Sequence, residues 1–241
     1  MSENELAALE AWVRANGGTV GPVRARARAA RGHGLVTTRA VRVGELLLRV
    51  PAALILTDES ASRSPLGRAL RAALPSATPA ELVCAALVHE RQLGDASAWA
   101  AWLRTVPTEY ESAPAWGTSE LELLGADALG TPLRARVRAE QAALRERHVA
   151  LRAALHATHG DGAAACALLA DGLCWRAFVS AWCAVHSRAA SIGRGAGKAS
   201  GLALVPMGDL FNHRPGAPTS ASYVRSECGC AYVGIVSVLH V

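Results

Sequence analysis

The hydrophobic pattern at the start of the chain predicts a short amphipathic helix over residues 4–15. Its apolar positions recur with the spacing of one helix face, and they are Leu6, Leu9, Trp12 and Val13. The sequence Asn16-Gly17-Gly18 follows, and these residue types tolerate the positive φ angles that end a helix.

The next part of the chain predicts extended structure. Residues 32–38 and 41–51 are rich in leucine and β-branched residues, which favour strands. Val43-Gly44 divides the second run, and Pro51 closes it because proline cannot continue a ladder of backbone hydrogen bonds. We therefore expect a β-hairpin here, after a basic stretch from Arg24 to Arg31.

The middle of the chain, residues 65–190, has mainly helical periodicity. Its longest amphipathic run covers residues 133–155, and residues 105–118 have the prolines and small polar residues of a loop. The glycine-rich residues 191–200 predict a mobile linker.

Strand-type sequence returns near the end of the chain, in residues 202–206, 221–225 and 230–239. Strands at both ends with helices between them predict an α+β fold. In such a fold, small sheets are assembled from distant parts of the chain around an inserted helical subdomain.

Composition narrows the class of protein. With 241 residues, of which 51% are hydrophobic and only 5% aromatic, the chain has enough apolar side chains for a large core and is not disordered. A formal charge of +5 tolerates acidic partners without requiring them. The six cysteines suit a reducing compartment, and neither a signal peptide nor a membrane span is visible. We expect a cytoplasmic or nuclear protein that binds no membrane.

Two short motifs are candidates for a binding site. In the first, Gly32 and Gly34 flank His33 just after Arg31, so the backbone has room to approach a ligand; a simple turn is the alternative. A third glycine and a following helix are absent, so a dinucleotide fingerprint is a poor interpretation.

The second motif places three hydrogen-bonding side chains within five positions, directly after an apolar strand. They are Asp209, Asn212 and His213. Such groups are costly to bury unless each finds a partner. A helix cap and turn before Pro215 is the alternative interpretation.

Other clusters give weaker signals. Cys228 and Cys230 could donate two thiolates to zinc, but a second pair with suitable spacing is missing, so a hairpin turn is preferred and no metal is expected. A solvated helix face is the interpretation for His148, His156 and His159. The same basic helix lacks interleaved aromatic residues, so direct nucleic-acid binding is not expected.

The residues 209–213, Asp-Leu-Phe-Asn-His, resemble the Asp-x-x-Asn-His signature of SET-domain protein methyltransferases, in the branch of the Rubisco large-subunit lysine methyltransferase. Three further segments are similar to parts of that family, in its order along the chain. Residues 32–51 resemble the opening of the SET fold, residues 98–107 with Trp116 its helical insertion, and residues 182–188 the helix before the cofactor loop. The resemblance covers about residues 10–238.

This resemblance implies S-adenosylmethionine as the methyl donor and a protein side chain, usually of lysine, as the acceptor; histidine is a variant. Carried over position by position, it implies a cofactor shell of Arg31, Gly32, His33, Arg188, Asp209, Asn212 and His213, with Tyr223 near the acceptor channel. For Arg188 alone, a cation at a helix C-terminus is the plain alternative.

The resemblance also implies a SET domain over residues 1–241, with SET parts at about 18–60 and 191–241 and the insertion at about 61–190. The family's catalytic Tyr-Gly strand has no counterpart before Val241. From sequence we therefore expect an incomplete C-terminal SET part and assign no catalytic residue. The family resemblance favours a protein-lysine methyltransferase, whereas the missing strand predicts no detectable transfer by this chain. A non-catalytic SET-like module that binds a protein partner is the alternative function. The substrate protein and the oligomeric state are not predicted.

Overall fold

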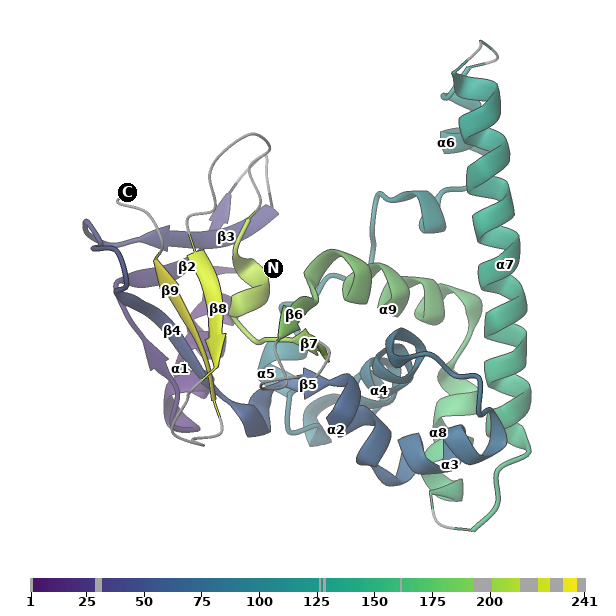
Figure 1. Ribbon diagram of the computed structural model, residues 1–241, viewed down its shortest axis with the longest axis horizontal. Coiled ribbons are helices and arrows are strands. Elements are labelled where there is room, and N and C mark those ends of the chain that lie inside the picture. The colour runs from purple at the N-terminus through teal and green to yellow at the C-terminus, as the bar shows by residue number, and fades with distance from the viewer. Residues whose placement is uncertain are drawn as a thin grey trace. The chain divides into compact units, whose positions relative to one another are not determined.

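The computed structural model describes residues 2–28, 32–125, 127, 129–160, 162–192, 201–212, 221–225 and 232–237. The chain forms two compact units (Figure 1). Unit 1 comprises Met1–Asp58, Asp95–Val106 and Arg188–Val241, and unit 2 comprises Glu59–Gly94 and Pro107–Ser187. Residues 95–106 thus belong with the strands, whereas the sequence interpretation placed them within the helical insertion. The SET-part boundaries named above stay a prediction.

The described residues of unit 1 form three small antiparallel sheets. Their strand orders are β1-β4-β9-β8, β2-β3 and β5-β7-β6. The strands are β1 (Thr19–Val20), β2 (Val23–Arg28), β3 (Gly32–Thr37), β4 (Leu46–Pro51), β5 (Leu56–Thr57), β6 (Ala190–Ile192), β7 (Gly201–Leu204), β8 (Ala221–Arg225) and β9 (Tyr232–Ser237). Each of the three sheets includes at least one strand from the first 60 residues, and two of them pair such a strand with one from beyond residue 200. The expected assembly of sheets from both ends of the chain is confirmed.

The hairpin expected over residues 32–51 is wrong. β3 pairs with β2, while β4 pairs with β1 and β9. Between β3 and β4 the chain turns at Gly44, whose φ is +80°, and the Glu45 N–H donates to the carbonyl of Arg42. The basic stretch is itself a strand: Val23 and Ala25 are buried, whereas Arg24 and Arg26 are exposed. This alternation of period two is the signal that marks β2.

The linker expected at residues 191–200 is partly wrong. Ser191 and Ile192 belong to β6, which pairs with Leu202 and Gly201 of β7. Residues 193–200 lie outside the described part of the chain.

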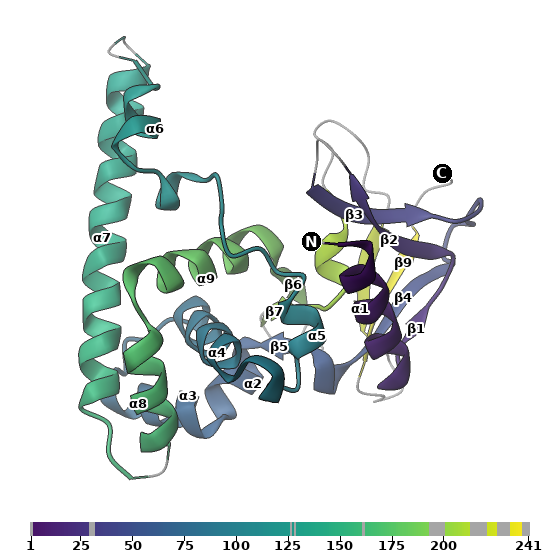
Figure 2. The ribbon, with the colours of Figure 1, turned by 180° about the vertical axis from the view of Figure 1, so that it is seen from behind.

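The first helix, α1 (Glu3–Ala15), confirms the periodicity prediction. Ser2 caps it by accepting from the Glu5 N–H, while the Glu5 carboxylate accepts from the Ser2 N–H. Figure 2 shows this helix on the near side of unit 1, and its buried face contacts β1 and β2. The helix α5 (Ala100–Leu103) also contacts α1. The resulting core of unit 1 includes Leu6, Leu9, Leu48 and Trp102.

Unit 2 is built from helices. They are α2 (Asp58–Arg63), α3 (Pro65–Ala73), α4 (Pro79–Leu93), α6 (Thr118–Glu122), α7 (Gly130–His156), α8 (Ala163–Gly172) and α9 (Trp175–Arg188). The first residue of α2, Asp58, and the last residue of α9, Arg188, belong to unit 1. The longest helix, α7, contains the run predicted at residues 133–155. No single helix in the described ranges is long and apolar enough to cross a membrane.

The inner face of α7 supplies much of the core of unit 2. Leu144, Leu151 and Leu155 are buried, and so is His148, whose Nε2 lies 2.8 Å from the Leu173 carbonyl oxygen. The His148 ring also stacks on Phe178, 5.3 Å between centroids. The expectation of a solvated face is therefore wrong for His148.

A buried ion pair joins α7 to the start of α4. Arg147 donates through Nε and Nη2 to the two carboxylate oxygens of Glu81, at 2.5 and 2.7 Å, and Glu81 also accepts from the Thr78 N–H in a capping box. Burial alone would raise the pKa of Glu81, but the hydrogen bonds from Arg147 and Thr78 outweigh it and lower that pKa. The ionised form of Glu81 therefore stabilises the folded state.

We predict that Glu81→Gln lowers the free energy of unfolding at neutral pH by about 2–4 kcal/mol, because a charged hydrogen-bond network is lost. A carboxyl with a lowered pKa stabilises above its unfolded pKa, and this contribution disappears as the pH falls through the folded pKa. The difference between wild type and variant should therefore shrink below about pH 4.

Urea unfolding across this pH range measures the effect. The matched control is Glu59→Gln, which breaks the exposed pair with Arg63 and should cost about 0.5 kcal/mol or less. Equal losses in the two variants, or a difference that persists in acid, would contradict the assignment.

Candidate functional site

The strongest concentration of buried polar groups in the motif region centres on Asp209. This residue lies in a short 3-10 turn, Gly208–Leu210, that follows β7. Its side chain is 0% exposed. The carboxylate oxygen Oδ2 accepts from Trp102 Nε1 at 3.2 Å and from Arg188 Nη1 at 3.2 Å, and Arg188 Nη1 also lies 3.3 Å from the Asp209 carbonyl oxygen. One acid thus joins three distant segments of unit 1.

Burial dominates the electrostatics of Asp209. It raises the pKa of this carboxyl, and the charge of Arg188 and the hydrogen bond from Trp102 oppose that rise. The second carboxylate oxygen, Oδ1, is buried and accepts no hydrogen bond from the described part of the chain. Arg188 keeps 17% of its side chain exposed. The pair therefore presents its cation, and not its acid, towards the surface of unit 1.

A strained turn orients Asp209 inward. Met207 has a φ of +61°, although it is not glycine, and it is fully buried. On either side of it, the Asp209 N–H donates to the Val205 carbonyl at 2.9 Å and the Leu210 N–H to the Met207 carbonyl at 3.1 Å. A non-glycine residue in this region costs on the order of 1–2 kcal/mol, so the surrounding contacts must hold the turn in place.

The two sequence motifs meet at Asn212. Its Nδ2 donates to the carbonyl oxygen of His33, 3.1 Å away, across 179 positions of sequence. Gly34 makes this approach possible, because a Cβ at position 34 would lie only 2.3 Å from Asn212 Nδ2. The glycine after His33 is therefore required by the close approach of a side chain.

Comparisons with known proteins identify the fold that holds these residues. No family model matches the chain. SET domain-containing protein 4 of Mus musculus is 26% identical over 201 residues, covering 80% of this chain, and its Homo sapiens counterpart is 25% identical over 197 residues. The chain spans 43% of the length of each of these curated relatives.

Solved structures decide the fold. A structure of Rubisco LSMT bound to sinefungin and monomethyllysine matches 100% of this chain and 51% of its own chain, with a TM-score of 0.78 and 23% identity. The SET domain of LSMT bound to lysine and AdoHcy matches 97% of this chain and 50% of its own, with a TM-score of 0.75 and 24% identity.

The chain has a SET-domain fold. The resemblance carried by the sequence motifs is thereby confirmed, as is the α+β class with small sheets around a helical insertion.

Within this SET fold, the predicted cofactor shell is described in part. Gly32 and His33 lie in β3, and Arg188, Asp209 and Asn212 form the contacts given above. Tyr223 lies in β8, where its backbone pairs with Ile235 of β9, and its side chain is outside what the structure describes. Arg31 and His213 also lie outside the described residues.

Sequence reasoning missed the role of Trp102. It assigned this residue to the helical insertion, whereas in the SET fold Trp102 is fully buried in unit 1 and donates to Asp209. The available signal is chemical, because a buried indole N–H usually requires an acceptor.

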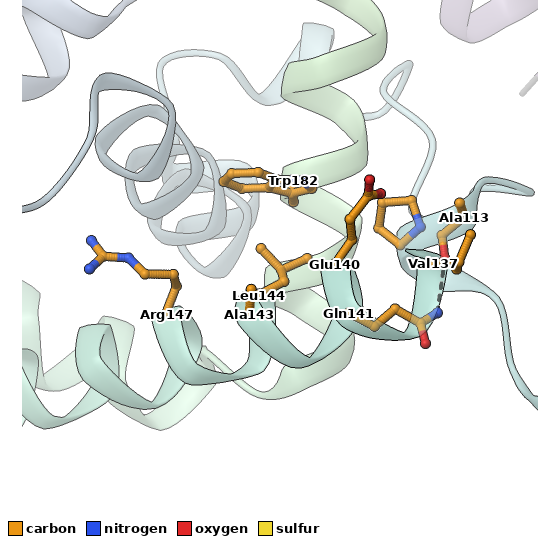
Figure 3. Close-up of a pocket in the computed structure, with 9 residues that line it drawn as sticks. Ala113, Val137, Glu140, Gln141, Ala143, Leu144, Arg147 and Trp182 are labelled. Atoms are coloured by element: carbon orange, nitrogen blue, oxygen red, sulfur yellow. Dashed lines mark hydrogen bonds between the residues drawn. The ribbon is translucent and has the colours of Figure 1, made fainter. Parts of the chain in front are cut away.

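Unit 2 has a groove of about 330 Å³ between α7, α9 and the segment before α6 (Figure 3). Apolar side chains and Trp182 line it, and Gln141 holds its edge by donating to the carbonyls of Ala113 and Trp116. None of the predicted site residues lines this groove. Among the described residues, no group of three or more His, Cys, Asp or Glu side chains could hold a metal ion. Cys228 and Cys230 lie outside that part of the chain.

We predict that Gly34→Ala breaks the Asn212–His33 hydrogen bond and lowers the free energy of unfolding by about 1 kcal/mol. The amide of Asn212 is the flexible end of a side chain, so it can move away from the new methyl group at little further cost. In an Asn212→Ala background the same substitution should cost much less, because the amide that the Cβ would strike is gone.

Urea unfolding of the four proteins in this double-mutant cycle measures the coupling. Equal costs of Gly34→Ala in both backgrounds would show that the glycine serves another purpose.

Proposed function

We propose that this chain binds S-adenosylmethionine and serves protein methylation, with a lysine side-chain amine as the methyl acceptor. The observation that carries the proposal is the joining of the two motifs, through Asn212 and His33, beside the Arg188–Asp209 pair. The solved neighbours of this fold support it, since they were determined with AdoMet, AdoHcy or sinefungin bound, and two of them with lysine or monomethyllysine.

The residues present suit such a cofactor. Arg188 uses Nη1 to bind Asp209, and neither its Nε nor its Nη2 has a partner in the described part of the chain. These donors can meet the carboxylate of an amino-acid ligand in a charge-assisted hydrogen bond. Gly34 lets the side chain of Asn212 reach β3, and the backbone beside Asn212 can pair with the edge of an adenine.

When bound, S-adenosylmethionine supplies a methyl group on a positively charged sulfur. The contribution of this chain is to hold and orient the cofactor. Asp209 fixes the guanidinium of Arg188 in one direction, and the Asn212–His33 hydrogen bond fixes the glycine-flanked strand β3. No described residue is assigned as the proton acceptor for the lysine amine.

The alternative is a SET-like module that binds a protein partner without methyl transfer. Such a module has the same fold as the methyltransferase and differs from it only in the absence of turnover. Measuring cofactor binding and methyl transfer on the same protein therefore distinguishes the two functions.

We predict saturable binding of S-adenosylmethionine in isothermal titration calorimetry. Arg188→Gln should weaken it by about tenfold to a hundredfold, because a hydrogen bond to a charged group is lost. The matched control is Arg176→Gln, which removes an exposed arginine paired with Glu109 and should leave the affinity unchanged. Absence of saturation at millimolar ligand would refute the cofactor assignment.

Transfer is then measured with cofactor labelled in its methyl group and a cell lysate as a source of acceptor proteins. Incorporation into protein lysine, lost in Arg188→Gln, supports the methyltransferase. Tight binding without incorporation favours the binding module.

A further inference from the structure

Trp102 is held in place through both its backbone and its ring. Its carbonyl oxygen accepts from the Thr105 N–H at 2.8 Å and from the Thr105 hydroxyl at 2.7 Å, and Thr105 is itself buried. The indole ring is fully buried, and the helix α5 that carries it contacts α1. Because both parts of the residue are enclosed, the direction of its indole N–H is fixed.

The indole N–H points at the oxygen that also binds Arg188. Trp102 Nε1 and Arg188 Nη1 each lie 3.2 Å from Asp209 Oδ2. The last torsion of an aspartate side chain has a broad preference, so Asp209 does not fix the position of this oxygen by itself. The indole donor restrains that torsion.

The position of Oδ2 in turn determines the direction of the guanidinium. Arg188 Nη1 also lies 3.3 Å from the Asp209 carbonyl oxygen, so one nitrogen is held by two acceptors of the same residue. A guanidinium is planar and its donors have a fixed geometry. When Nη1 is held, the directions of Nε and Nη2 are therefore restricted as well.

Packing alone does not explain the acceptor that Trp102 uses. A buried indole N–H requires an acceptor, but a backbone carbonyl is sufficient. Trp99 in the same segment shows this, because its Nε1 donates to the carbonyl of Leu54 at 2.8 Å. Trp102 instead donates to the side chain that holds Arg188.

We propose that Trp102 is a positioning residue for the candidate cofactor site. Its indole N–H orients Asp209, and Asp209 orients the guanidinium of Arg188 towards the carboxylate of S-adenosylmethionine. Trp102 is fully buried and acts only through Asp209. This inference rests on the proposed cofactor binding and adds a residue behind that site.

Calorimetric titration with S-adenosylmethionine tests the proposal. Trp102→Phe keeps an aromatic ring in the core and removes the N–H, so it should weaken binding by about threefold to tenfold. The matched control, Trp99→Phe, makes the same substitution in the same segment and should keep wild-type affinity. In an Arg188→Gln background, Trp102→Phe should weaken binding much less, because its effect passes through Arg188.

A second measurement needs no cofactor. Burial raises the pKa of Asp209, while the charge of Arg188, which faces this carboxyl, and the hydrogen bond from Trp102 oppose the rise. Loss of a donor to the ionised form raises a pKa further. The Asp209 carboxyl resonance, assigned with Asp209→Asn, should therefore titrate at higher pH in Trp102→Phe and be unchanged in Trp99→Phe. In wild type, the Trp102 indole N–H resonance should shift over the same pH range as that carboxyl, which requires no variant.

The possible failures are distinguishable. Wild-type affinity in Trp102→Phe, or an equal loss in Trp99→Phe, would overturn this inference and leave the cofactor assignment intact. An undiminished effect in the Arg188→Gln background, or an indole resonance that ignores the titration of Asp209, would overturn it as well. Absence of saturation in the wild-type protein refutes the cofactor assignment and this inference together.

Discussion

The burial of one carboxylate, that of Asp209, constrains much of unit 1. A charged group without solvent is costly unless it is paired and hydrogen-bonded. The partners of Asp209 come from far away in sequence: Trp102 precedes it by 107 positions and Arg188 by 21. Residues 95–106 must therefore fold with the strands, even though helices of unit 2 flank them on both sides in the sequence. The hydrogen bond to Asp209, together with the contact of α5 with α1, holds this segment in unit 1.

The sheets impose the same long-range connectivity. β4 pairs with β9 and β5 with β7, so each ladder joins residues before position 60 to residues after position 200. The entropic cost of closing a loop grows only slowly with the length of the loop. The fold of unit 1 can therefore accommodate an inserted helical unit of this size once the ladders form. Unit 2 needs a core of its own to be inserted in this way, and the inner face of α7 and the Glu81–Arg147 pair provide it.

The sequence predicts the elements whose signal is local. α1 and α7 follow from apolar spacing, because in each case one face is buried, and β7 and β8 lie within or beside the runs of strand-type sequence at residues 202–206 and 221–225. Pairing is not local, and this is why the hairpin prediction failed. Strand β4 has the composition of a hairpin partner, but the turn at Gly44 sends it to β1 and β9 instead. β2 was missed because its arginines were interpreted as charge and not as the exposed half of an alternation.

The candidate site was likewise predictable from sequence only in part. The motifs at residues 32–34 and 209–213 identify residues that meet in the fold, but their roles follow from burial, which no motif reveals. The side chain of Asp209 has no exposed surface and acts through Arg188, and Trp102 is a core residue that donates to that buried acid. Met207 also depends on burial, because its positive φ is strained and the surrounding contacts must hold it. Two backbone hydrogen bonds, complete burial of Met207 and the carboxylate network together fix it, so the direction of Arg188 is set before any ligand arrives.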